Sequence, residues 1–176
     1  MPVRPLVHLQ VHKRSGSKTR GILRAGGAVF PVALGRAGIL ANKFEGDGGT
    51  PRGTFRLKRL WWRKDRITRP QTALPVRPIR HEDAWSEDPA DRRYNRPVRR
   101  LSSEPGDRLM REDGLYDLII EIDHNDRPRV ARRGSAVFIH LARPGFKPTA
   151  GCIALRKQDL LKLLALVGPR TRVVIF

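Results

Sequence analysis

Glycine and proline interrupt the chain at short intervals, and this most restricts the folds that it can adopt. There are 16 glycines and 14 prolines among 176 residues, and both residue types interrupt helices. The apolar runs between them are short. Some alternate with polar residues, as Val7, Leu9 and Val11 do, which is typical of half-buried strands. The pattern predicts a mostly β (α+β), loop-rich fold, and the length suits a single domain over residues 1–176.

The expected strands lie in apolar runs bounded by turn residues. Two of them, at residues 22–25 and 28–32, flank Gly26-Gly27, where both turn positions tolerate positive φ and favour a hairpin. The others are expected at residues 53–57, 115–122, 135–141 and 173–176. One helix is expected near the C-terminus, where five apolar side chains share a helical face before Gly168-Pro169. These side chains are Leu160, Leu161, Leu163, Leu164 and Val167.

Residues 61–112 form the least regular part of the chain. The segment is rich in arginine and proline and carries Trp61, Trp62, Trp85 and Tyr94 as apolar anchors. A loop this long inside a compact domain is usually functional or disordered, and the interleaved aromatic residues favour order. We expect an ordered lid or wall.

The chain is strongly basic. Its 36 lysines and arginines outnumber its 17 aspartates and glutamates, which gives a net charge of +19. Such a surface attracts polyanions, namely nucleic acid, an anionic membrane face or an acidic cell-wall polymer. No stretch approaches the roughly 18 apolar residues of a membrane span, and no signal peptide is visible at the N-terminus. The charge indicates an anionic partner without identifying it.

The only cysteine, Cys152, lies in a Gly-Cys turn shortly after His140. A thiol and an imidazole are the parts that cysteine-based acyl transfer needs, because the imidazole takes the thiol proton. The alternative is that Cys152 is a small buried apolar residue, as free cysteines often are. His8 and His12 share one face of an expected strand but lack further ligands nearby, so no metal or other cofactor is expected.

Several motifs follow one another in a specific order. Residues 43–55 contain Thr50-Pro51-Arg52-Gly53-Thr54-Phe55, a Thr-Pro-x-Gly-x-Phe hairpin pattern. Trp85, Asp88-Pro89, Tyr94-Asn95, Tyr116-Asp117, residues 134–140 and Thr149-Ala150-Gly151-Cys152 follow it. Together these motifs resemble the L,D-transpeptidase catalytic domain family (YkuD-like) of bacterial cell-wall enzymes, and the resemblance covers most of the chain.

The resemblance implies a β-rich sandwich with the Gly-Cys turn at the edge of an open groove. It makes Cys152 the nucleophile and His140 its base, with the backbone N–H groups of Gly151 and Cys152 as oxyanion donors. His140 either accepts the thiol proton or holds the pair as thiolate and imidazolium with a lowered thiol pKa. A backbone carbonyl is expected to orient the imidazole. Thr149 either hydrogen-bonds near the thiol or caps the turn.

Further candidate contacts of the substrate are Tyr94, Asn95, Lys43, Glu45 and Asp47. Tyr94 and Asn95 either contact the substrate from the long loop or anchor that loop. The three charged residues either line the groove or form a solvated turn.

Two positions depart from the family pattern. Ala150 stands where many relatives carry histidine, and Ala154 where many carry asparagine or arginine. The spacing from His140 to Cys152 is also shorter than in the best-known members. These departures leave the donor bond and the type of cross-link open.

The resemblance implies an L,D-transpeptidase whose thiolate attacks the meso-diaminopimelate carbonyl of a peptidoglycan stem peptide. The amine of a second stem then resolves the thioester and forms a cross-link. If water takes the place of the amine, the enzyme is an L,D-carboxypeptidase or endopeptidase. The chain could instead be a wall-binding module without catalysis or a basic nucleic-acid-binding module, but no recognised nucleic-acid-binding motif is present. We expect a monomer in the periplasm or cell envelope, with stem peptides and no nucleic acid as partners.

Overall fold

The computed structural model describes residues 4–101 and 103–176, and strands dominate them. A single α-helix, α1 (Lys157–Leu164), is present in this part of the chain, together with a short 3-10 turn, η1 (Pro144–Phe146). The strands are β1 (His8–Lys13), β2 (Arg20–Ala25), β3 (Ala28–Ala33), β4 (Ile39–Leu40), β5 (Thr50–Pro51), β6 (Gly53–Trp62), β7 (Val76–Pro78), β8 (Asp83–Trp85), β9 (Pro97–Arg99), β10 (Asp107–Arg108), β11 (Leu118–Ile122), β12 (Phe138–Leu141), β13 (Ile153–Leu155) and β14 (Arg172–Ile175). The predicted mostly β fold and the Gly26-Gly27 hairpin are confirmed.

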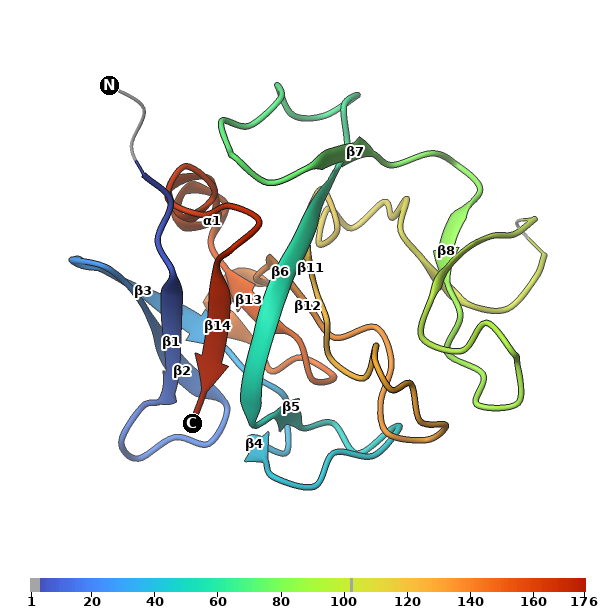
Figure 1. Cartoon of the computed structure of the whole chain (residues 1–176), viewed down its shortest axis with the longest axis horizontal. Coiled ribbons are helices and arrows are strands. Elements are labelled where there is room, and N and C mark those ends of the chain that lie inside the picture. Colours follow the sequence, from blue (N-terminus) through green and yellow to red (C-terminus); the bar gives the residue numbers. More distant parts are fainter. Residues whose placement is uncertain (1–3, 102) are drawn as a thin grey trace.

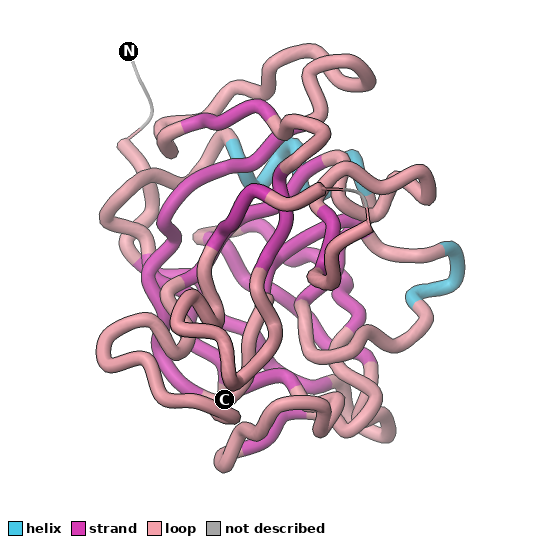
Figure 2. Tube along the Cα trace, turned by 90° about the vertical axis from the view of Figure 1, so that its right-hand side faces the viewer, coloured by secondary structure: helices cyan, strands magenta, loops and turns pink. Residues whose placement is uncertain are grey.

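The main sheet closes on itself. Its strand order is β11-β12-β13-β3-β2-β1-β14-β6-β7, and β6 also pairs with β11 at the opposite end. The long strand β6 therefore lies between β14 and β11 and completes a ring (Figure 1). Figure 2 shows the strands around the centre of the molecule and the loops outside them. Closure leaves few free strand edges for pairing with other chains.

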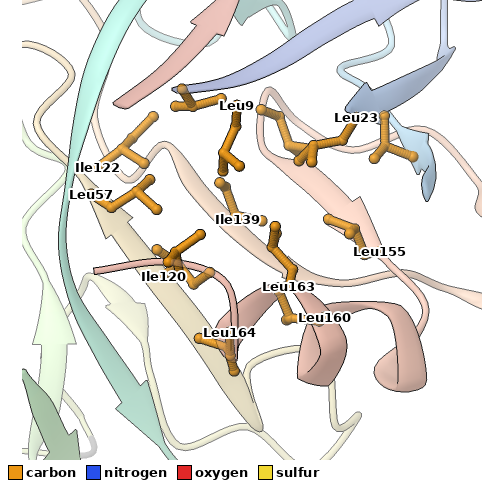
Figure 3. Packing of buried hydrophobic residues seen from close by; sticks show 14 of the residues in the cluster. Leu9, Leu23, Leu57, Ile120, Ile122, Ile139, Leu155, Leu160, Leu163 and Leu164 are labelled. Carbon is orange, nitrogen blue, oxygen red and sulfur yellow. The ribbon is translucent and has the colours of Figure 1, made fainter. Parts of the chain in front are cut away.

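The principal hydrophobic core fills this ring. Alternation along β1 places Leu9 and Val11 inside, where both are fully buried. The helix contributes Leu160, Leu163 and Leu164, also fully buried, which turn toward the sheet (Figure 3). Burying such side chains contributes about 1.5–3 kcal/mol each. The apolar face of the predicted helix therefore covers the core.

Within the predicted irregular segment, residues 61–101 and 103–112 are ordered and more regular than their composition indicates. Its first two residues extend β6, because the indole of Trp61 is fully buried and donates to Glu121 on neighbouring β11 (Nε1 to Oε2, 2.9 Å). Further along, β10, β8 and β9 form a small separate sheet. A second core cluster packs beneath this segment and includes Trp61, Trp85, Phe138 and Cys152. The segment forms a wall against the strands that carry the Gly-Cys turn.

Two predicted strands begin later than expected. β11 starts at Leu118 instead of residue 115, and β12 at Phe138 instead of residue 135. In the second case, Ala136 adopts a left-handed conformation with φ 50°, which interrupts the extended backbone. Within residues 4–101 and 103–176, no helix combines the length and apolar character needed to cross a membrane.

Candidate active site

Two neighbouring parallel strands bring Cys152 and His140 together. The register of β12 and β13 pairs Ile139 with Ile153 and His140 with Ala154. Cys152 immediately precedes β13, so it lies one residue before the first of these two pairs. Side chains two residues apart lie on the same face of a strand, and Cys152 and His140 therefore share a face. Strand spacing and rise put their Cα atoms roughly 8 Å apart, a distance that the two side chains together span. Both side chains line the same cavity.

The sulfur of Cys152 is held by two backbone groups. The N–H of Phe138 donates to Sγ (3.3 Å), and the thiol donates to the carbonyl of Ala136 (3.2 Å). The residue is 7% exposed, and burial raises the pKa of the thiol to about 12. The structure therefore holds a neutral thiol, and the alternative of a resting thiolate with a lowered pKa is not supported. The effect of burial on the thiol pKa is larger than that of the hydrogen bond from the Phe138 N–H, which alone would lower this pKa.

His140 is held as a neutral base. Its Nδ1 lies 2.8 Å from the carbonyl oxygen of Leu141, and a carbonyl can only accept a hydrogen bond. Nδ1 therefore carries the proton and Nε2 keeps its lone pair. Burial, with the nearby cations of Arg111 and Arg143, lowers the pKa of His140 to about 4. A backbone carbonyl thus orients the imidazole in this chain.

The turn before Cys152 is built by close contact between backbones. The N–H of Gly151 donates to the Thr149 hydroxyl (3.1 Å), which itself donates to the Cys152 carbonyl (2.6 Å). A side chain at Gly151, whose φ is +145°, would bring its Cβ to 2.7 Å from the Gly49 carbonyl oxygen. Thr149 therefore caps the turn. The Gly151 N–H, expected to be an oxyanion donor, is bound to Thr149 instead.

Two cavities meet at Cys152. The cationic cavity, of about 420 Å³, is lined by His140, Cys152 and uncharged residues together with Arg36, Arg111, Arg143 and Lys147. The carboxylate-lined cavity, of about 310 Å³, contains Glu45, Glu87 and Asp107, together with Lys43 and the shared Arg36 and Arg111. Cys152, Ala150 and Tyr116 line both. The sulfur, although buried, is therefore at a position that ligands on either side can approach.

Tyr116 contacts His140, and Asp107 and Arg111 of the long segment contact Tyr116. Of these three residues, only Tyr116 was among the sequence motifs. The Tyr116 ring packs edge-on against His140, with centroids 5.2 Å apart. Its hydroxyl donates to Asp107 (2.6 Å), and the Arg111 guanidinium lies 4.8 Å from the ring centroid. Tyr116 carried a weak motif signal. Nothing distinguishes Arg111 or Asp107 from the other charged residues of an Arg-rich segment in the sequence.

The three charged candidates from the early hairpin divide between two roles. Lys43 and Glu45 line the carboxylate-lined cavity, and Lys43 is paired with Asp47 (Nζ to Oδ1, 2.6 Å). Asp47 also accepts the N–H groups of Phe44 and Gly49, and it lines neither cavity at Cys152. These hydrogen bonds lower its pKa against the opposing effect of burial. Asp47 thus shapes the turn.

Tyr94 and Asn95 are buried, and neither lines a cavity at Cys152. The Tyr94 hydroxyl donates to Glu45. The Asn95 carbonyl oxygen accepts the Trp85 indole N–H (2.9 Å) and the Ala136 N–H (3.2 Å). Its amide donates to two backbone carbonyls in the loop after β11. Of the two roles expected at these positions, the structure favours loop anchoring.

The two positions that depart from the family pattern are beside the site. Ala150 is exposed and lines both cavities, while Ala154 is buried opposite His140 and lines the cationic cavity. Short methyl side chains at these positions offer no hydrogen bond to a ligand. Within the described residues, no group of three or more histidine, cysteine or carboxylate side chains is arranged to hold a metal ion.

One comparison with known proteins gives a match. The family model described as the L,D-transpeptidase catalytic domain (YkuD) matches residues 9–175. No curated protein and no solved structure matches the chain. The matched region contains every strand of the closed ring except the first residue of β1, and it contains both cavities.

Proposed function

Because the chain belongs to the L,D-transpeptidase catalytic domain family, we propose that it forms peptidoglycan cross-links through a thioester on Cys152. The observation that carries the proposal is the position of Cys152 between two cavities of different charge. Cross-linking needs a donor and an acceptor on the two sides of one sulfur. The cationic cavity suits the carboxylates of a donor stem peptide. The carboxylate-lined cavity suits the amine of an acceptor.

The proposed reaction begins with a proton transfer on substrate binding. The Cys152 thiol leaves the Ala136 carbonyl and gives its proton to Nε2 of His140, and the sulfur attacks the meso-diaminopimelate carbonyl carbon. The C–N bond breaks, and the departing amine takes the proton from the imidazolium. The acceptor amine then attacks the thioester and gives one proton to Nε2 of His140, the C–S bond breaks, and the imidazolium returns that proton to the sulfur. The Cys152 N–H remains the proposed oxyanion donor.

The carboxylate-lined cavity favours transfer to an amine over transfer to water. Glu45 and Asp107 accept hydrogen bonds from tyrosines, whereas Glu87 forms no ion pair or side-chain hydrogen bond among the described residues. Glu87 remains accessible to solvent, but partial desolvation by the surrounding protein, with repulsion from Asp107 and Glu45, raises its pKa to about 7. A carboxylate of this pKa attracts an ammonium and takes its proton near neutral pH. L,D-carboxypeptidase or endopeptidase activity is the alternative.

The test is incubation with purified muropeptides, followed by mass spectrometry of products and of intact protein. Cross-linked products and an acyl-enzyme are expected, and neither is expected with Cys152→Ala. Glu87→Gln should lower the ratio of cross-linked to hydrolysed product about 10-fold, the effect of losing one charge-assisted hydrogen bond. The matched control is Glu82→Gln, which lines neither cavity. Hydrolysis alone by the unaltered protein would establish the carboxypeptidase or endopeptidase alternative.

A further inference from the structure

The structure has another cavity, of about 370 Å³, from whose lining Cys152 is absent. It lies where the segment between β8 and β9 meets the loop after β11, against residues 137–138. Its charged lining consists of Lys58, Arg59, Arg96, Arg127, Arg129, Glu121 and Asp126. Five cations and two carboxylates leave a net charge of +3. We call it the arginine cavity.

The two carboxylates of the arginine cavity are already engaged. Glu121 pairs with Lys58 (3.1 Å) and Arg59 (3.2 Å). Asp126 pairs with Lys58 (3.0 Å) and Arg129 (3.1 Å). Two other arginines line the cavity, Arg96 and Arg127. Among the described residues, neither guanidinium group forms an ion pair with a carboxylate.

Arg129 is also incompletely satisfied. Its Nε–H is buried and has no hydrogen-bond partner among residues 4–101 and 103–176. An unpaired buried donor is unfavourable. Burial and repulsion from the Arg96 and Arg127 cations lower the pKa of Arg129, in spite of its pairing with Asp126. The cations of Arg96 and Arg127 therefore act on Arg129 in a cavity whose two carboxylates do not balance its five cations.

The loops that carry these groups are tied together. The Asn95 amide donates to the carbonyls of His124 (3.0 Å) and Asn125 (2.9 Å), and so joins the β8–β9 segment to the loop after β11. The Asn125 side chain accepts the Val130 N–H (2.9 Å) and donates to the Gly134 carbonyl (3.0 Å). The two loops that carry the arginines are thus joined before any ligand arrives, which reduces the entropic cost of binding, although the side chains of Arg96 and Arg127 remain exposed.

We propose that the arginine cavity binds a phosphate group through Arg96, Arg127 and Arg129. A dianion offsets most of the net charge of the cavity, and the oxygens of a phosphate can accept from three guanidinium forks at once. A single carboxylate carries half that charge and only two oxygens. The phosphate belongs either to a soluble phosphoester or to a lipid headgroup, and both present the same chemistry to the cavity.

The test measures binding of inorganic pyrophosphate by isothermal titration calorimetry in 150 mM salt, where roughly 8 Å screening suppresses long-range attraction. Arg96→Gln/Arg127→Gln should weaken binding at least ~10-fold, because two charge-assisted contacts are lost. The matched control is Arg14→Gln/Arg24→Gln, which removes the same charge from exposed positions in the β1–β2 hairpin. This control should change affinity less than ~3-fold. Unchanged cross-linking by the first variant verifies that it is folded.

Three results would overturn the proposal. These are no binding at millimolar pyrophosphate, equal losses in the two double variants, or binding of citrate as tight as that of pyrophosphate. Vesicles with and without phosphatidylglycerol then identify the source of the phosphate. Vesicle binding that Arg96→Gln/Arg127→Gln abolishes supports a lipid headgroup. Pyrophosphate binding without vesicle binding supports a soluble phosphoester.

Discussion

Replacement of Asn95 by alanine should destabilise the protein strongly, because this side chain joins three segments. It receives the Trp85 indole N–H and the Ala136 N–H, and it donates to the carbonyls of His124 and Asn125, at 2.9 to 3.2 Å. The residue is 7% exposed, so water can replace these partners only poorly. Asn95→Ala leaves two buried donors unpaired, each at a cost of about 1–3 kcal/mol.

The expected loss is therefore about 4 kcal/mol for the two donors together. For a domain of this size, each kcal/mol corresponds to roughly 2–4 °C in Tm, so Tm should fall by about 8–16 °C. Part of any loss comes from backbone strain, because Asn95 has a φ of 54°. Asn95→Gly tolerates that conformation and isolates the hydrogen bonds. It should still lose most of the stability.

The same change should also disturb the thiol. Asn95 holds the N–H of Ala136, a residue in a left-handed conformation whose carbonyl accepts the Cys152 thiol proton. Acylation of Cys152 by muropeptides should therefore fall at temperatures where the variant remains folded. Scanning calorimetry and intact-protein mass spectrometry measure the two effects, with exposed Asn42→Ala as control. A Tm within 3 °C of the unaltered protein, with a raised KM instead, would refute the anchoring role and favour substrate contact.

Three further predictions concern the thiol, the histidines His140 and His124, and the Gly-Cys turn. At a pKa of about 12, the thiolate fraction of Cys152 at pH 7 is about 10⁻⁵, so iodoacetamide should alkylate it roughly 1000-fold more slowly than a free cysteine. The alkylation rate should still rise above pH 9, whereas a plateau below pH 8 would reveal a thiolate–imidazolium pair. Burial lowers the pKa of His140 and of His124 from 6.5 to about 4, so stability is complete above pH 6.5 and declines as the pH falls toward 4. At pH 5 the buried His140 should cost about 2 kcal/mol in urea unfolding and the partly buried His124 less, and a total loss under 1 kcal/mol would contradict the burial of His140 as a neutral group. Gly151→Ala should lower Tm by several degrees and abolish acylation, because its Cβ would lie 2.7 Å from the Gly49 carbonyl oxygen. Gly16 has a φ of +75°, and a Cβ there would meet no described residue beyond its chain neighbours within 4 Å. Gly16→Ala therefore controls for backbone strain alone, and equal effects of the two changes would exclude the contact as the cause.

The local sequence determined the elements and the family. Alternating Leu9 and Val11, the Gly26-Gly27 turn and the leucines of α1 each act through neighbours a few residues away, and such short-range patterns are readable without a structure. The order of the hairpin, tyrosine, histidine and Gly-Cys motifs was sufficient to identify the L,D-transpeptidase family. These features depend on spacing along the chain.

Tertiary structure decided the chemistry of the site. Whether the Cys152 thiol is neutral depends on burial and on two backbone groups from another strand, and no sequence pattern gives the dielectric of a folded interior. The Gly151 N–H proved to be bound by Thr149, and Asn95 proved to anchor loops, because each polar group bonds to whatever the fold brings near it. The closure of β6 onto β11 and the assembly of the arginine cavity are long-range in the same sense. Contacts between distant segments have no signature in a single sequence, and they set the electrostatics on which function depends.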